Sequence, residues 1–188
     1  MKLSVTLLAT LALSSAIVAN EANTTMPAKK EGVKYIKMLG MALKSELKKQ
    51  LQADKSGVKA LHFCVDRASK ITSKVNSKLP SNVKVRRTAL KLRNEANKAD
   101  ATDIKVMQEY TQKIKEGKFS PKDIAVVEVN GTTRVYKPLV TAQACLKCHG
   151  EHITPEIDAV LKKYYPHDKA IGFKKGDLRG VMVTEIKK

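Results

Sequence analysis

The sequence predicts an α+β domain in which helices come first and a small antiparallel sheet follows. In the first half, apolar residues recur every three or four positions, which is the spacing of one helix face. In the second half, β-branched residues gather around Asn130-Gly131, a strong signal for a two-residue hairpin turn. Strands and helices do not alternate along the chain, so a doubly wound parallel sheet is not expected.

Two long helices are expected in the first half of the chain. One runs from Val33 to Leu51 and is followed by a break over Asp54–Gly57. The other runs from Val58 to Leu79 and ends at Pro80, which cannot continue a helix. The apolar stripe of this second helix consists of Leu61, Cys64, Val65, Ala68, Ile71 and Val75.

Residues 83–100 are basic and irregular, and no regular element is expected there. The expected elements that follow are a helix over 102–115, strands over 124–129 and 132–139, a helix over 155–164 and a strand over 178–186. Pro155 suits the first position of its helix, with Thr154 before it as the cap.

The N-terminus has the layout of a secretory signal peptide over residues 1–19. A positive start precedes an apolar run from Leu3 to Leu13, and small residues close the segment. The run is too short to span a bilayer, although an uncleaved N-terminal anchor is the alternative. Residues 20–30 are polar and small and are expected to form a flexible leader, which leaves residues 31–188 as one domain. Cleavage would release a soluble periplasmic protein.

The chain carries a formal net charge of +18, with 36 Lys and Arg against 18 Asp and Glu. In a cytoplasmic protein this excess would indicate nucleic-acid binding. The expected export and the scarcity of aromatic residues, with no Trp, argue against that class. The charge is typical of solvated helix faces, and it would also steer the protein toward a partner with an acidic docking surface.

The most specific motif is Cys145-Leu146-Lys147-Cys148-His149, because C-x-x-C-H is the attachment site of a c-type haem. Two thiols three residues apart can reach the two vinyl groups of one porphyrin, and the imidazole that follows can bind the iron. Covalent attachment takes place on the exported side of bacterial membranes, which agrees with the signal peptide. The alternatives are a zinc site, which needs four ligands, and a redox dithiol, which would follow a βαβ pattern.

A sixth ligand for the iron can be sought on the apolar stripe of the second helix. Cys64 lies on that stripe, whereas His62 falls on the polar side. A free thiol in an oxidising compartment tends to pair or oxidise unless it is buried or ligated. Stripe position alone favours the simpler interpretation that Cys64 is a small buried hydrophobe. The other candidates are His152, His167, Met107 and Met182.

Six segments of the chain carry a second, more specific pattern: Phe63–Ala68, Val85–Asn94, Tyr136–Leu139, Cys145–Gly150, Tyr165–Gly172 and Gly176–Gly180. Together they resemble the bacterial single-haem c-type proteins with a PAS-like fold, a family long classed as a domain of unknown function. The resemblance implies a PAS-like antiparallel sheet with N-terminal helices packed around one covalently bound haem. It also implies His149 and a helix cysteine, here Cys64, as the axial ligands.

Two roles are expected from these observations. The family often carries this domain ahead of signalling modules, which implies sensing of redox state or of a small gas, here through a separate signalling protein. The alternative is a periplasmic electron carrier that exchanges electrons with an acidic partner protein. A peroxidase-like enzyme is least expected, because no acid–base constellation is evident. Arg86, Arg87 and Arg93 are candidates for contacts to the haem propionates, although the sequence alone favours a solvated basic loop for them.

Overall fold

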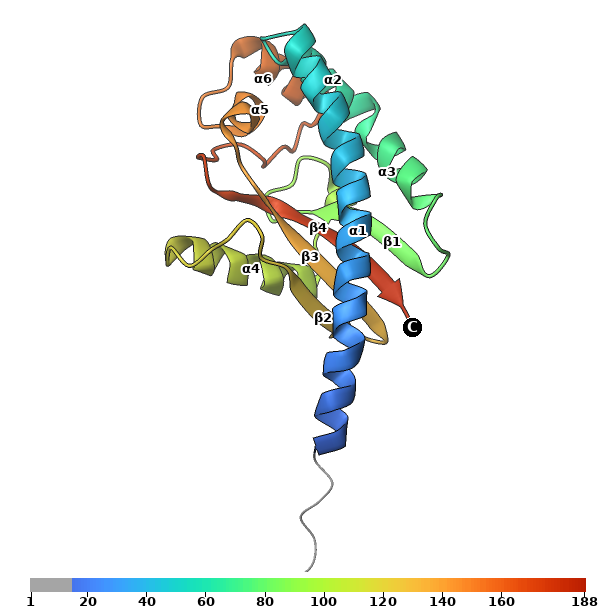
Figure 1. The fold of residues 1–188 in the computed structure, drawn as a ribbon. Helices are drawn as coiled ribbons and strands as arrows, with labels where there is room; N and C mark the ends of the chain where they lie inside the picture. Colours follow the sequence, from blue (N-terminus) through green and yellow to red (C-terminus); the bar gives the residue numbers. More distant parts are fainter. Residues whose placement is uncertain (1–14) are drawn as a thin grey trace, which may run out of the picture.

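The structure is a computed structural model that describes residues 15–188, with side chains from Met26 onward. It is an α+β domain with N-terminal helices and a four-stranded antiparallel sheet, so the predicted fold class is confirmed, and the arrangement is consistent with a PAS-like fold (Figure 1). The helices are α1 (Ser15–Ala53), α2 (Val58–Asp66), α3 (Ala68–Asn76), α4 (Ala101–Lys115), α5 (Leu146–His149) and α6 (Pro155–Tyr164), with short 3-10 turns η1 (Glu95–Asn97) and η2 (Gln143–Cys145). The strands are β1 (Val83–Thr88), β2 (Ala125–Val129), β3 (Thr132–Val140) and β4 (Leu178–Lys187).

The strand order in the sheet is β1-β4-β3-β2, and every neighbouring pair is antiparallel. The predicted hairpin between β2 and β3 is present. Asn130 and Gly131 both have positive φ angles, 47° and 72°, as a type I′ turn requires. The last strand in the sequence, β4, therefore lies in the middle of the sheet, between β1 and β3.

The two faces of the sheet pack against different helices (Figure 1). On one face, Val85 and Val135 pack against α1 and α3. On the other face, Tyr136 and Val183 pack against α4. Helix α1 crosses its face at very short range, since a Cβ atom on Gly32 would lie 2.5 Å from the side chain of Val135. Each strand therefore divides its alternating side chains between two separate cores.

Helix α1 is longer at its N-terminal end than the sequence predicts. Residues 20–30, which are expected to form a flexible leader, are helical in the structure. The helix includes Pro27, and the segment after it, from Ala28 to Glu31, consists of strong helix formers. Residues 1–14 of the predicted signal peptide lie outside the described part of the chain. Within residues 15–188, no helix combines the length and apolar character that crossing a membrane requires.

Two further predictions are wrong in their detail. The expected helix over 58–79 is broken at Arg67, because α2 packs on α6 while α3 packs on the core under α1. The stretch that begins at residue 83, expected to be irregular, begins with the edge strand β1. Its basic residues conceal the strand pattern, since Val83 and Val85 are buried between charged neighbours.

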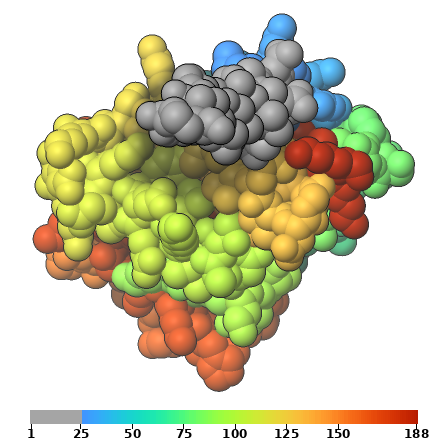
Figure 2. Space-filling model, turned by 90° about the horizontal axis from the view of Figure 1, so that it is seen from below, coloured from blue at the N-terminus to red at the C-terminus, as the bar shows by residue number. Residues whose placement is uncertain are grey.

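The two ends of the domain are formed by different secondary-structure elements. At one end, α2, α5 and α6 gather beyond the sheet (Figure 1), and Leu61, Ile157 and Leu161 form a small core between α2 and α6. At the opposite end lie α4 and the β2–β3 hairpin, which Figure 2 shows from below. The C-x-x-C-H motif belongs to the first of these ends.

Candidate haem-binding site

The motif is held on a single helical turn. Cys145 ends η2, and Cys148 and His149 end α5, so the three side chains come from about one turn of a short helical segment. The chain then bends at Gly150, where a Cβ atom would lie 2.5 Å from the carbonyl oxygen of Leu146. Glycine at this position is therefore required by the tight turn that follows His149.

The ring of His149 is fixed in one tautomer. Its Nδ1 lies 2.7 Å from the carbonyl oxygen of Ala170, and because a carbonyl can only accept, Nδ1 carries the hydrogen. The Nε2 lone pair is therefore free to bind a metal ion. Burial, together with the charges of Arg93 and Arg179, lowers the pKa of His149 to about 3. The imidazole is neutral at pH 7, which is the state that coordinates iron.

Arg93 connects the motif to the loop that carries Ala170. Its Nη2 donates to the carbonyl oxygens of Cys148 at 2.6 Å and Ala170 at 3.2 Å. The same guanidinium pairs with Asp168 at 2.9 Å, and both side chains are 8% exposed. Asp168 in turn accepts from the backbone N–H of Ala170 at 2.8 Å. The turn after α5 and the 168–170 loop are thus joined through one buried ion pair.

A cluster of three arginines, which we call the site arginines, surrounds this point: Arg87, Arg93 and Arg179. All three line a cavity of about 140 Å³ together with His149. The Nε atoms of Arg87 and Arg179 are buried and have no hydrogen-bond partner within the described residues. Burial lowers the pKa of Arg87, and burial with nearby Arg93 lowers that of Arg179 to about 10. The cluster has an excess of buried positive charge and free donors.

Cys64 lies beside this cluster. It packs at the edge of the core under α1, and burial raises the pKa of its thiol, while Arg87, Arg93 and Arg179 oppose that rise. Cys64 also contributes to the raised pKa of Cys148, about 11, for which burial is the main cause. The structure therefore brings Cys64 close to the motif. The three cysteines of the chain form no disulfide with one another.

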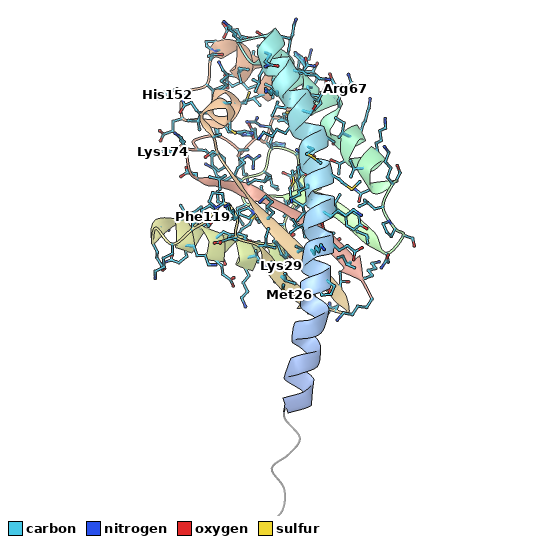
Figure 3. All side chains as sticks on the ribbon, in the orientation of Figure 1. Met26, Lys29, Arg67, Phe119, His152 and Lys174 are labelled. Carbon is cyan, nitrogen blue, oxygen red and sulfur yellow. The ribbon has the colours of Figure 1, made fainter. Side chains whose placement is uncertain are left out.

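Of the other candidate ligands, Met182 lies in the same core that Cys64 borders, and the rest lie elsewhere. Met107 is fully buried in the core on the α4 face of the sheet. Met182 packs in the core under α1, and His62 packs edge to face on Tyr164 with ring centroids 5.8 Å apart. His167 is exposed, and His152 lies on the outer side of the domain (Figure 3). In residues 15–188 no group of three or more His, Cys, Asp or Glu is arranged to hold a metal ion.

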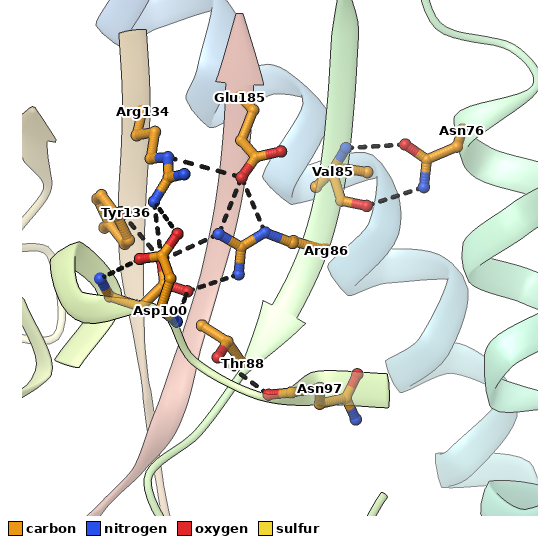
Figure 4. Close-up of polar contacts among 10 residues, drawn as sticks. Asn76, Val85, Arg86, Thr88, Asn97, Asp100, Arg134, Tyr136 and Glu185 are labelled. Atoms are coloured by element: carbon orange, nitrogen blue, oxygen red, sulfur yellow. Dashed lines mark hydrogen bonds and ion pairs between the residues drawn. The ribbon is translucent and has the colours of Figure 1, made fainter. Parts of the chain in front are cut away.

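The structure separates the two arginines for which the sequence predicts the same role. Arg87 belongs to the site arginines, but Arg86 points to the opposite face of the sheet because strand residues alternate. There its guanidinium pairs with Asp103 at 2.8 Å and with Glu185 at 2.8 Å (Figure 4). The expectation of a propionate contact from Arg86 is therefore wrong, since its donors are already used by two carboxylates.

Known proteins can be compared with this geometry. A family model described as Tll0287-like (Tll0287) matches residues 9–186. The chain belongs to the Tll0287-like family. Among solved structures it is similar to one titled as the crystal structure of the cyanobacterial heme-protein Tll0287, with a TM-score of 0.54 and 23% sequence identity, covering 64% of this chain and 70% of the other. At that identity the likeness shows the fold alone. A search of curated proteins found no match.

The donor set of this Tll0287-like chain suits haem c. Two thiols and a neutral imidazole lie on one turn, and the site arginines offer free donors of the kind that pair with carboxylates such as propionates. The cavity itself is smaller than the roughly 300–1,000 Å³ of most cofactor pockets. The side chains that line it, the unpartnered arginines first, have to move outward to admit a porphyrin.

Sequence reasoning did not assign roles to Asp168, Ala170 and Arg179. All three lie within segments that carry the family resemblance, Tyr165–Gly172 and Gly176–Gly180. The family resemblance was therefore the signal in the sequence that could have pointed to these three residues. Residue type alone could not distinguish Arg179 from the many basic side chains on the surface.

Proposed function

We propose that this chain is an exported, soluble, monohaem c-type protein of the periplasm that senses redox state or a small gas. Cys145 and Cys148 form thioether bonds to one haem, His149 is the proximal ligand and Cys64 is the sixth ligand. Bound haem supplies the electron-transfer and gas-binding chemistry that amino-acid side chains lack. The observation that carries the proposal is the neutral, Nδ1-protonated His149 on the same turn as both thiols.

The position of Cys64 supports its role as the sixth ligand. Burial raises the pKa of the Cys64 thiol, and the positive charges of the site arginines partly offset that rise. A thiolate is an anionic, electron-rich ligand that stabilises ferric over ferrous iron, so the reduction potential is low. On reduction the thiolate becomes easier to protonate and release, which would open the iron to a small ligand.

The surface supports an acidic partner protein. Helices α1 and α3 expose lysines that form no ion pair with the described acidic residues: Lys34, Lys37, Lys44, Lys48, Lys70 and Lys74. Such a surface attracts a partner with an acidic docking face and speeds the encounter at low salt. This partner is a separate signalling protein for a sensor, or a redox protein for the alternative role of electron carrier. We assign no enzymatic reaction to this site.

The first experiment tests attachment. The full chain is produced in a host that matures c-type cytochromes, denatured, and extracted with acidified organic solvent. Haem stays with the chain if the thioether bonds form. The double variant Cys145→Ser/Cys148→Ser, which lacks both thiols, should lose its haem in the extraction. Cys64→Ala is the matched control, because it also removes a thiol but leaves both thioethers. Complete extraction of haem from the unaltered chain would contradict the proposal.

The second experiment separates the two roles. Carbon monoxide is added to the reduced protein and the Soret band is recorded. A shifted band means that the iron opens on reduction, as a sensor requires. An unchanged band means that both ligands stay bound, as a carrier requires. Cys64→Ala raises the midpoint potential if Cys64 is the sixth ligand, and an unchanged potential contradicts that assignment.

A further inference from the structure

We propose that Arg93 is a positioning residue that sets how strongly His149 donates electrons to the iron, through the carbonyl group that both side chains share. The inference rests on the proposed haem-binding function and deepens it. Arg93 acts on His149 through Ala170.

The shared acceptor is the carbonyl oxygen of Ala170. His149 Nδ1 lies 2.7 Å from it and Arg93 Nη2 lies 3.2 Å from it. An oxygen that accepts from a guanidinium is a weaker acceptor for a second donor. The Nδ1–H of His149 is therefore less polarised than it would be if this carbonyl accepted a hydrogen bond from His149 alone. A less polarised imidazole has less imidazolate character and donates less density through Nε2, which favours ferrous iron.

Three contacts fix the position of the Arg93 side chain. It pairs with Asp168, it donates to the carbonyl of Cys148 at 2.6 Å, and it lies over the loop whose Ala170 N–H bonds to the same Asp168. Because Arg93 and Asp168 are each only 8% exposed, solvent does not compete for these donors. A movement of the 168–170 loop changes the hydrogen bond of His149 only together with this ion pair.

Electrostatics acts in the same direction as the hydrogen bond. The Arg93 guanidinium is a fixed positive charge beside His149, and it disfavours the more positive ferric state. Loss of the charge and release of the Ala170 carbonyl both lower the reduction potential. The two effects add, so the direction of the change does not depend on their relative size.

The matched control is Arg86, which is also a partly buried arginine that pairs with carboxylates, but on the α4 face of the sheet. Arg86→Gln and Arg93→Gln remove the same charge and both break a buried ion pair. If Arg93 had a purely structural role, Arg93→Gln and Arg86→Gln would differ only in the part of the core that each destabilises.

The first readout needs no haem. Nitrogen-15 and proton NMR of the haem-free chain reports the Nδ1–H of His149. We expect this proton to move downfield in Arg93→Gln, because Ala170 then accepts from His149 alone, and to stay in place in Arg86→Gln. An unmoved proton in Arg93→Gln, or an equal movement in Arg86→Gln, overturns the inference.

The second readout is the midpoint potential of the haem-loaded protein. We expect it to fall in Arg93→Gln and to hold its value in Arg86→Gln. Arg93→Lys keeps the charge but not the guanidinium, in which Nη2 reaches both carbonyls while Nε binds Asp168. Its potential therefore lies between those of the unaltered chain and Arg93→Gln. If Arg93→Gln does not fold, the lysine variant decides, and an unchanged potential and proton resonance there overturn the inference. If the unaltered chain binds no haem, the proposed function fails, while the NMR readout still tests the role of Arg93.

Discussion

Two arginine clusters lie on opposite faces of one sheet, and neighbouring residues of β1 belong to different clusters. Beneath α4, Arg86 and Arg134 are matched by the carboxylates of Asp100, Asp103 and Glu185 (Figure 4). On the other face, Arg87, Arg93 and Arg179 have one close carboxylate, that of Asp168. The α4 face is electrostatically complete within the protein, and the site face is not.

The difference indicates which cluster serves folding and which serves binding. Buried charges are normally paired, because desolvation is costly for a charge left alone. Unpartnered Nε atoms occur in both clusters, on Arg87 and Arg179 and also on Arg134, but only the site face has more guanidinium groups than close carboxylates among the described residues. The site cluster is therefore stabilised fully only when a ligand supplies the missing negative charge. Haem propionates would supply it.

The largest effect is expected from Asp103→Asn. Asp103 is fully buried and accepts from both terminal nitrogens of Arg86 and from the Tyr136 hydroxyl. Removing one partner of a buried ion pair is strongly destabilising, so the variant should lose about 3–5 kcal/mol of unfolding free energy. Urea unfolding of the haem-free protein measures it. A loss as small as that of an exposed ion pair would break the comparison between the clusters.

The loss of unfolding free energy at alkaline pH should also depend on the α4 face of the sheet. Burial raises the pKa of Tyr136 to about 12 from its ordinary value of 10.0. A raised pKa means that the folded state holds the proton more tightly. The stability from this group is complete below pH 10 and is lost as the pH rises toward 12, at up to about 1.4 kcal/mol per pH unit. Urea unfolding across that range measures the slope, and Tyr136→Phe should make it shallower.

A smaller effect is expected from Asn76→Ala. The Asn76 amide bonds both backbone groups of Val85, donating to its carbonyl and accepting from its N–H, each at 2.8 Å (Figure 4). This contact holds β1 in the alignment that sends Arg86 and Arg87 to opposite faces. Its loss should cost about 1–2 kcal/mol, measured by thermal or urea unfolding. Ser77→Ala, on the neighbouring exposed position of the same helix end, is the control and should cost less.

The smallest change in stability is expected from Arg87→Gln. Because burial lowers the pKa of Arg87, the folded protein already disfavours its charge, and removal should change the unfolding free energy by less than about 1 kcal/mol or raise it. The same variant should lose haem contacts and lower the yield of loaded protein. A destabilisation as large as that of Asp103→Asn would show that Arg87 is structural after all.

Local sequence patterns predicted much of this fold. The elements that were predicted wrongly depend on contacts between residues far apart in the sequence. The hairpin at Asn130-Gly131 and the helix ending at Lys115 follow from short-range turn and periodicity signals. Strand β1 was missed because its charged residues find partners far along the chain: Arg86 pairs with Glu185, a contact that no local pattern encodes. The break at Arg67 has the same origin, since the two halves of that segment pack on different partners.

The candidate site divides in the same way. The motif of Cys145, Cys148 and His149 is readable because its chemistry requires a fixed local spacing. The prediction that Cys64 is a ligand rests on the family resemblance, and Cys64 is among the groups that raise the pKa of Cys148 in the motif. The roles of Arg93 and Asp168 depend on a buried pair formed between residues 75 positions apart, so they became visible only in three dimensions.

The backbone contacts of β1 also determine how these molecules can associate. An outer strand usually presents unpaired N–H and C=O groups that recruit a strand from another chain. Here Asn76 occupies both groups of Val85, the N–H of Val83 bonds to the carbonyl of Pro80, and Ala89 bridges to Lys98. Several groups on this margin of the sheet are therefore occupied within the molecule, which leaves fewer of them free to pair with a strand of another molecule than a long, flat and uncovered edge would present.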